Sequence, residues 1–398
     1  MADARGLGRT GRLLYAGPGP TNIPDGVLRA IDRATIDFND PAFLEVFDAA
    51  LAGLKRVLRT RGEVFLYTAS GHGAWEATLV NLLSPGDHVL VLESGWFSET
   101  WGAMAARHGL HVRTVPADWR HGIDPHAVTA ALRADTGHAV KAVLCVHNET
   151  STGLAADLPA IRQAIDAAGH SALFLVDTIS SLASLDFRMQ EWGIDAAVGG
   201  SQKGLMLPTG FSFTAVSERA LHAHAQARLP RFYFDWSMMQ GRRHRSFVGT
   251  IPTGLFYGLQ ESIRRLEAEG LERVLARHRL LAEGARAAVR AWAANDGPRL
   301  FCADPARFSD SVTGVLMPEG HDAERVRETA LQRFNVALGG GLGRLGGRVF
   351  RIGHLGDLNA AMVMGVLSAV EMSLRICGVP HGRGGVEAAL SHFAEAAR

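Results

Sequence analysis

The sequence predicts an α/β protein in which a mostly parallel sheet, covered by helices on both faces, precedes a smaller α+β domain. Three observations support this prediction. Short apolar segments alternate with helical patterns from residue 63 to about residue 200, which is typical of strand–helix–strand crossovers. Turn residues, as in Ser84-Pro85-Gly86-Asp87, separate many of these segments. The alternation stops near Thr250, and longer helical patterns follow.

The first part of the chain supplies the elements of this sheet. Residues 23–34 and 43–58 are expected to be helices, and Pro41 suits the first turn of the second helix. The strands near Ala196 and Phe211 follow more closely than the others, so they are expected to include an antiparallel partner. The expected strands of the alternating region are residues 64–67, 88–92, 111–115, 140–146, 172–176 and 195–200. The expected helices between them are residues 74–83, 97–108, 124–133 and 158–168.

The last third of the chain has a different organisation. Apolar residues recur on one face of a helix from Gly254 onward, and a second helix follows Gly270. A β-rich stretch, a helix at residues 323–333, a glycine-rich segment at residues 339–347 and a helix at residues 360–377 come next. We therefore expect an N-terminal arm (residues 1–22), a large domain (residues 23–253) and a small C-terminal domain (residues 254–398).

The composition excludes several classes of function. The 41 Lys and Arg residues balance 40 Asp and Glu residues, so the chain lacks the basic character typical of nucleic-acid binding. No apolar run reaches the ~20 residues of a membrane-spanning helix. Cys145, Cys302 and Cys377 are far apart and odd in number, which favours a reducing compartment. We therefore expect a cytoplasmic protein that has no metal site and binds neither nucleic acid nor membrane.

Lys203 is the residue that most suggests chemistry. It follows the expected strand at residues 195–200, and the apolar residues Leu205, Met206 and Leu207 come soon after it. A lysine held among apolar neighbours loses its proton more readily, because burial disfavours the ammonium form. The neutral amine can then attack an aldehyde and form a Schiff base. On this pattern alone, an ordinary surface lysine is the alternative.

Other polar groups follow neighbouring strands, and ligands of open parallel sheets bind at the carboxyl ends of strands. Ser70-Gly71-His72-Gly73 precedes a helix, so it is either a phosphate-binding helix N-terminus or a plain cap. Asp177 ends a buried strand, where it either caps a turn or pairs with a cationic ring nitrogen. The polar run at residues 147–153 is a third candidate, with turn formation as its alternative. Residues 17–21 form either a linker or a backbone strap over a site.

Taken together, these residues resemble the class V aminotransferases of the pyridoxal-phosphate fold-type I group, and within it the serine–, alanine– and aspartate–glyoxylate aminotransferases. The resemblance covers nearly the whole chain. Its motifs are Gly17-Pro18-Gly19-Pro20-Thr21-Asn22, Ser70-Gly71-His72-Gly73, His147-Asn148-Glu149-Thr150-Ser151-Thr152-Gly153, Val176-Asp177, Gly200-Ser201-Gln202-Lys203-Gly204 and Arg351-Ile352-Gly353-His354-Leu355-Gly356-Asp357. It implies a seven-stranded sheet and pyridoxal 5′-phosphate as cofactor. It also implies transfer of an amino group from serine, alanine or aspartate to glyoxylate or a similar 2-oxo acid.

The resemblance further implies roles for matching positions. Lys203 would form the Schiff base and carry the proton between substrate Cα and cofactor C4′, while Asp177 would keep the ring nitrogen protonated. Arg351 would bind the substrate α-carboxylate, with Gly19 also at the substrate. Thr250 would reach the phosphate of the neighbouring subunit in a homodimer whose active sites lie at the interface. The other implied cofactor contacts are Ser70, Gly71, His72 and Gln202 at the phosphate, Phe97 and Ile179 on the two ring faces, and Thr150 near the phenolic oxygen.

Departures from the family pattern leave the substrates open. Residues 37–43 look more like runs in ureidoglycine–glyoxylate and pyridoxamine–pyruvate aminotransferases than like serine–glyoxylate relatives. Residues 246–249 and Thr253 also differ, and they are expected near the substrate pocket. Those two transaminases are therefore alternatives. A lyase of the same fold, such as a cysteine desulfurase, is a weaker one, because none of the three cysteines has the sequence setting of an exposed, activated nucleophile.

Overall fold

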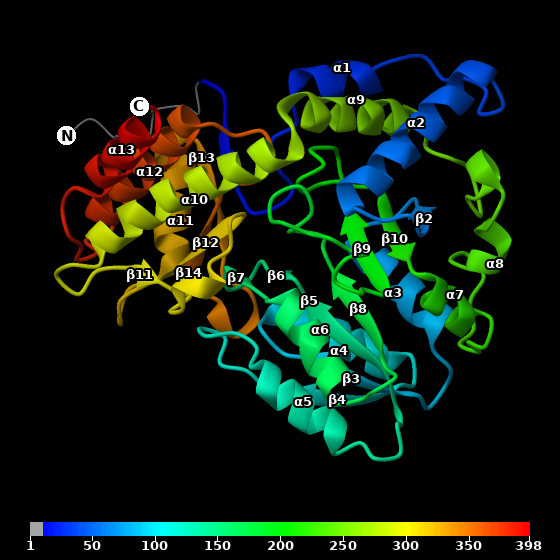
Figure 1. Ribbon diagram of the computed structural model, residues 1–398. Helices are drawn as coiled ribbons and strands as arrows, with labels where there is room; N and C mark the ends of the chain where they lie inside the picture. Colours follow the sequence, from blue (N-terminus) through cyan, green and yellow to red (C-terminus); the bar gives the residue numbers. More distant parts are fainter. Residues whose placement is uncertain (1–10) are drawn as a thin grey trace.

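The computed structural model describes residues 11–398, so the first ten residues of the predicted arm lie outside the described residues. Two sheets organise the fold, one of seven strands and one of five, together with a two-stranded hairpin. Figure 1 shows the larger sheet with its helices on one side of the molecule and the five-stranded sheet with helices α10 to α13 on the other.

The seven-stranded sheet confirms the predicted fold class. Its strand order is β2-β10-β9-β8-β5-β3-β4. β10 runs antiparallel to both of its neighbours, whereas the other neighbouring pairs are parallel. Of the two closely spaced strands near Ala196 and Phe211, the second is therefore the antiparallel one. In sheet order the strands are β2 (Glu63–Tyr67), β10 (Ser212–Val216), β9 (Ala196–Gly200), β8 (Leu173–Asp177), β5 (Val140–Val146), β3 (His88–Leu92) and β4 (His111–Val115).

Helices cover this sheet, and local sequence explains several of their ends. The carboxylate of Asp40 caps α2 by accepting the amide N–H of Ala42 at 2.8 Å, and Pro41 occupies the first helical position. Asp124 and Asp157 cap α5 and α6 in the same way. The helices of this part are α1 (Asp25–Ile31), α2 (Pro41–Leu58), α3 (Gly71–Leu82), α4 (Trp96–Arg107), α5 (Pro125–Arg133), α6 (Leu158–Ala167), α7 (Glu218–His224) and α8 (Trp236–Met239).

Helix α3 begins earlier than the sequence predicted. The expected turn at Ser70-Gly71-His72-Gly73 is the first turn of the helix, which starts at Gly71 rather than Ala74. Glycine is a poor helix former, so propensity placed the start too late. The position is set by packing: a Cβ on Gly71 would lie 2.3 Å from Cδ1 of Ile179, so only glycine lets the helix approach so closely.

The five-stranded sheet has the order β1-β13-β14-β12-β11. Its first strand comes from the N-terminal arm and pairs parallel with β13, more than 300 residues later in the chain. Its strands are β1 (Leu14–Ala16), β13 (Val336–Gly340), β14 (Val349–Gly353), β12 (Val312–Leu316) and β11 (Arg299–Leu300). Its helices are α10 (Leu271–Trp292), α11 (Ala323–Phe334), α12 (Ala360–Ile376) and α13 (Gly385–Ala396).

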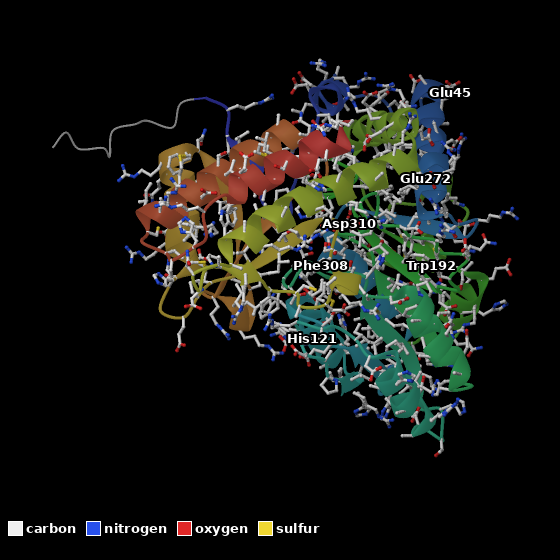
Figure 2. The ribbon with its side chains drawn as sticks, turned by 60° about the vertical axis from the view of Figure 1, so that its left-hand side comes forward. Glu45, His121, Trp192, Glu272, Phe308 and Asp310 are labelled. Carbon is white, nitrogen blue, oxygen red and sulfur yellow. The ribbon has the colours of Figure 1, made fainter. Side chains whose placement is uncertain are left out.

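The division into domains at residue 254 stays a prediction. Helix α9 (Thr253–Glu269) packs against α1 and α2, and its buried Phe256, Leu259 and Ile263 belong to the same apolar cluster as the large sheet (Figure 1). Helix α9 therefore packs with the large-sheet part of the molecule, although the predicted boundary assigns it to the small domain. Figure 2 shows Phe308 and Asp310 near the middle of the molecule, and Phe308 forms an isolated bridge with Leu154 of the large-sheet part.

Two classes of feature are not found in the described chain. Within residues 11–398, no helix combines the length and hydropathy needed to cross a membrane. The same residues contain no group of three or more His, Cys, Asp or Glu side chains that could hold a metal ion.

Candidate active site

A cavity of about 200 Å³ lies at the carboxyl ends of the parallel strands. Val146 at the end of β5, Asp177 at the end of β8 and Gln202 and Lys203 just after β9 all line it. The predicted site residues in its wall are Gly19, Ser70, Gly71, His72, Phe97, Thr150, Asp177, Ile179, Gln202 and Lys203. A larger groove of about 840 Å³ lies where β2 and β9 begin and β10 ends, near Asp195 and Trp192, but it contains none of these residues.

Lys203 is buried, with 8% of its surface exposed. Burial and the positive charge of Arg351, opposed by Asp177, together lower the pKa of its amine to about 8, and burial is the largest of these causes. The Nζ atom donates a hydrogen bond to the carbonyl of Pro18. The amine is therefore held in one position and is easily deprotonated near neutral pH.

Residues 17–21 form the backbone strap that the sequence allowed. The strap passes directly over Lys203: a Cβ on Gly19 would lie 2.1 Å from the lysine Nζ, and the φ of Gly19 is +135°. Thr21 ties the strap down by donating to the carbonyl of Lys203 at 3.1 Å. On its other side the strap packs against β14, where a Cβ on Gly353 would lie 2.5 Å from the carbonyl oxygen of Gly17. Glycine is thus required by close backbone approach on both sides.

Asp177 is buried, and each of its carboxylate oxygens accepts one hydrogen bond. The amide of Ile179 donates to Oδ1 at 2.6 Å, and the indole N–H of Trp75 donates to Oδ2 at 3.1 Å. The pKa of this carboxyl is raised to about 7, mainly by burial and also by the charge of Glu149, while the two hydrogen bonds and Lys203 act in the opposite direction. Asp177 is therefore a poorly solvated carboxylate that a cationic partner would stabilise.

The N-terminus of α3 opens onto the same cavity. The side chain of Ser70 makes no capping hydrogen bond, which is evidence against the plain cap as its role. The first amides of a helix have no partner within the helix and carry the positive end of its dipole, so they attract an anion. His72 is half-buried, and burial lowers its pKa. The neighbouring side chain of Gln202 leaves its buried amide oxygen without a partner among the described residues.

Phe97 lines the cavity from the first turn of α4, and a buried carboxylate fixes that turn. Glu149 is fully buried and accepts the backbone N–H groups of Phe97 and Ser98 at 3.2 Å each. It also accepts the amide and hydroxyl of Ser151 at 3.1 and 2.6 Å. Negative charge at a helix N-terminus is favourable, so Glu149 joins α4 to the hairpin of β6 (Asn148–Glu149) and β7 (Leu154–Ala155).

Thr150 belongs to a buried hydroxyl network at the cavity wall. Its hydroxyl donates to Ser180 Oγ at 2.7 Å, and Ser180 donates to the carbonyl of Asn148 at 2.8 Å. The amide nitrogen of Asn148 donates to Ser311 Oγ at 2.7 Å, which links the network to the C-terminal sheet. The amide oxygen of Asn148 has no partner among the described residues.

Arg351 does not line the cavity but lies next to it on β14. Its Nε donates to the carbonyl of Gly340 at 2.7 Å and its Nη1 to the carbonyl of Thr150 at 3.0 Å. Within residues 11–398 no carboxylate forms an ion pair with this buried guanidinium. Burial lowers its pKa to about 10, so it stays charged at neutral pH. A guanidinium with spare donors and no anionic partner is suited to bind a carboxylate.

The structure does not bring Thr250 or a cysteine into the cavity. Thr250 is exposed and is not among the residues that line the cavity of its own chain. Cys145 and Cys302 are buried, Cys377 is partly buried at the end of α12, and none of them lines the cavity. Burial raises the pKa values of Cys145 and Cys302, so neither has the character of an activated thiol.

Several cavity residues were not found from the sequence. Trp75, Ser180 and Thr209 line the wall of the cavity. Glu149 holds the backbone of another wall residue, Phe97, by accepting its amide N–H. Trp75 could have been noticed one helical turn after Gly71, on the same face as the expected phosphate site. Glu149 lies within the polar run at residues 147–153, but nothing local shows that its carboxylate reaches the amide of Phe97.

Comparison with known proteins places this geometry in a family. The family model described as Aminotransferase class-V matches residues 20–343. A protein named L-aspartate--glyoxylate aminotransferase from Paracoccus denitrificans is 46% identical over 379 residues, which covers 94% of this chain and 95% of that protein. A serine--glyoxylate aminotransferase from Methylorubrum extorquens is 45% identical and covers 97% of both chains.

Solved structures agree with these sequence matches. The ureidoglycine-glyoxylate aminotransferase of Bacillus subtilis superimposes with a TM-score of 0.87 at 28% identity, covering 97% of this chain and 99% of that one. The pyridoxamine-pyruvate aminotransferase of Mesorhizobium loti gives a TM-score of 0.88 at 27% identity, covering 98% and 99%. A cysteine desulfurase from Escherichia coli is 17% identical with a TM-score of 0.71, which shows a shared fold alone.

Proposed function

Because this chain belongs to the class V aminotransferases, we propose that it moves an amino group from a small amino acid to glyoxylate or a similar 2-oxo acid. The enzymes of this family depend on pyridoxal 5′-phosphate, and we propose the same cofactor here. One observation carries the proposal: a desolvated amine, Lys203, and a buried carboxylate, Asp177, line one cavity. An amine and a carboxylate in this arrangement suit an aldehyde at one end of a ring and a basic ring nitrogen at the other.

The residues around the cavity fit this cofactor. The N-terminus of α3 offers amides and a helix dipole to a phosphate. The buried amide oxygens of Gln202 and Asn148, which lack partners among the described residues, favour a polar occupant over an apolar one. We propose that Phe97 and Ile179 pack on the two faces of the ring and that Thr150 lies near its phenolic oxygen.

The side chains of this protein then divide the work of transamination. When bound, the cofactor supplies an electron sink for the charge left on the substrate Cα. Lys203 removes the proton from that carbon and later returns one, because burial keeps a useful fraction of its amine neutral at neutral pH. Asp177 accepts a hydrogen bond from the ring nitrogen and holds a proton there. Arg351 binds the substrate α-carboxylate and so fixes the position of Cα.

The named relatives narrow the proposed substrates. The two sequence relatives at 45–46% identity are named for aspartate or serine as donor and glyoxylate as acceptor. The ureidoglycine and pyridoxamine enzymes match as structures at 27–28% identity. We therefore favour serine, alanine or aspartate as donor and glyoxylate as acceptor. The test is a panel of these donors, with ureidoglycine and pyridoxamine, assayed against glyoxylate and pyruvate; turnover with pyridoxamine alone would overturn the proposal.

The cofactor is tested by absorbance. The purified protein should show a Schiff-base absorption band that disappears when an amino donor is added, and Lys203→Ala should abolish both the band and turnover. Lys141→Ala is a matched control, because Lys141 is an exposed lysine on β5. A protein that shows no spectral change with any donor is not the transaminase proposed here.

We also propose that the protein is a homodimer in which Thr250 contributes to the partner's phosphate site. Thr250 is exposed, and the nearby Phe232 and Tyr233 are 70% and 44% exposed, which is unusual for aromatic side chains and favours a covered surface. A mixture of Lys203→Ala and Thr250→Ala chains tests this. If each site uses both subunits, half of the mixed dimers' sites carry both defects and the other half carry neither, so mixing should restore activity. Activity that never exceeds that of the Thr250→Ala dimer would exclude the arrangement.

A cytoplasmic location completes the proposal. It is supported by three free cysteines that are not paired with each other. Immunoblotting of separated cytosolic, membrane and secreted fractions tests it, and recovery outside the cytosol would contradict it.

A further inference from the structure

Trp75 is placed to act on Asp177 rather than only to fill the wall of the cavity. It is fully buried in α3 and lines the cavity, and its indole N–H donates to Asp177 Oδ2 at 3.1 Å. The other oxygen, Oδ1, accepts the amide of Ile179 at 2.6 Å. Among the described residues, Trp75 therefore supplies the one side-chain donor in hydrogen-bond contact with this carboxylate. Two donors, one on each oxygen, fix the plane of the carboxylate.

The indole cannot turn away from this contact. Its ring is stacked on Trp101, with centroids 5.5 Å apart and planes at 13°, and it meets Phe97 edge-on at 6.3 Å. His72 packs at 4.5 Å from it. A donor that is already oriented loses little conformational entropy when it binds a charged acceptor, so little of the free energy of this hydrogen bond is lost to ordering the indole.

The surroundings of Asp177 make this bond important. The charged and titratable groups that face the carboxylate are Glu149 from β6, Lys203 after β9 and Cys145 on β5. Burial and Glu149 both favour its protonated form, while Lys203 favours the ionised form. Once Lys203 has condensed with an aldehyde, its nitrogen carries a positive charge only while it is protonated. When that nitrogen is neutral, the backbone of Ile179 and the indole of Trp75 are the protein groups that still favour the ionised form of Asp177.

We propose that Trp75 is a positioning residue of this transaminase: its indole N–H orients the carboxylate of Asp177 and stabilises its charged form, through which it acts on the ring nitrogen of the cofactor. This inference rests on the proposed function. In this role, Trp75 influences the protonation of the cofactor ring nitrogen through Asp177, without contacting that nitrogen itself.

The chain offers a matched control for the test. Trp101 is equally buried and belongs to the same stack, but its indole N–H has no hydrogen-bond partner among the described residues. Trp75→Phe and Trp101→Phe therefore remove the same group and nearly the same volume. Only the first of them removes a donor from Asp177.

The readout is a pH titration of the absorbance of the holoenzyme, together with kcat and KM. Trp75→Phe should move the spectral midpoint upward by about one pH unit, because a less ionised Asp177 leaves less positive charge on the ring and the nitrogen derived from Lys203 then holds its proton more tightly. It should lower kcat about tenfold and change KM for the amino donor less than about twofold, since Arg351 is untouched. Trp101→Phe should leave the midpoint unchanged.

A second variant guards against misfolding. Replacement of Trp75 by 3-benzothienylalanine keeps the bicyclic shape but has no N–H, and it should shift the midpoint as Trp75→Phe does. If both Trp75 variants fold, bind the cofactor and titrate like the parent enzyme, the inference is overturned although the transaminase assignment stands. If the parent enzyme itself shows no donor-dependent spectral change, it is the proposed function that fails.

Discussion

Gly19→Ala is the sharpest test of the site geometry. A Cβ at position 19 would lie 2.1 Å from Nζ of Lys203, and the shortest ordinary contact is 3.4 Å, so the amine must move by about 1.3 Å. Misplacement of a catalytic group by ~1 Å can lower the rate by ~10²-fold. We therefore expect kcat for the half-reaction with an amino donor to fall about 100-fold. Stopped-flow absorbance of the holoenzyme measures it directly.

The control separates this displacement from backbone strain. Gly210 has the same φ of +135°, but a Cβ there would meet nothing closer than Leu255 at 3.9 Å. Alanine at either position should lower the free energy of unfolding by about 1–3 kcal/mol, because the left-handed backbone region disfavours a side chain. Gly210→Ala should keep kcat within about threefold of the parent enzyme. Equal kcat values for the two variants, at equal fraction folded, would refute the idea that the strap positions Lys203.

Three further predictions concern side chains in and around the cavity. Arg351→Lys should raise KM for the amino donor about 10–100-fold, because an ammonium that keeps the carbonyls of Gly340 and Thr150 has at most one donor left for a carboxylate and cannot bind it with two, and a charged hydrogen bond contributes about 1.5–3 kcal/mol. Steady-state kinetics measures this, and a KM within about twofold of the parent value would contradict it. Glu149→Gln should lower the free energy of unfolding of the cofactor-free protein by about 2 kcal/mol. Both carboxylate oxygens of Glu149 accept hydrogen bonds, whereas the glutamine amide would have a single oxygen acceptor. Urea denaturation measures this, and an unchanged midpoint would count against the capping role. In the cofactor-free protein, the rate of covalent cofactor binding should rise with pH and level off above about pH 8. The reason is that only the neutral amine of Lys203 reacts, and its pKa is lowered from 10.5 to about 8, mainly by burial. A rate that still rises at about pH 10 would mean that this amine is solvated.

The local pattern of the chain was enough to predict the fold class. Alternating apolar strands and helices indicated the parallel sheet, and the short spacing of the strands near Ala196 and Phe211 indicated an antiparallel member without deciding which of the two it is. These features depend on residues close together in sequence. The start of α3 was wrong because glycine at 71 and 73 reads as a turn, whereas the packing of Gly71 against Ile179 decides where the helix begins.

The identity of the candidate site residues was also available from the sequence, but the roles of their neighbours were not. Lys203 and Asp177 stand at the ends of β9 and β8, and strand ends at one edge of a parallel sheet meet whatever the details of the fold. The pairing of Trp75 with Asp177 joins residues 102 positions apart, and that of Glu149 with Phe97 joins residues 52 apart. Neither contact leaves a periodic or local signal.

The sequence by itself determined the order of the elements and the chemical groups that reach the carboxyl edge of the sheet, because hydrophobic period and turn residues act over a few positions. Tertiary structure alone decided that a strap from the N-terminus crosses Lys203 and that its strand β1 completes the C-terminal sheet beside β13. It also decided that α9 packs with α1 and α2. These contacts depend on which distant surfaces are complementary, and that complementarity exists only once the sheets have formed.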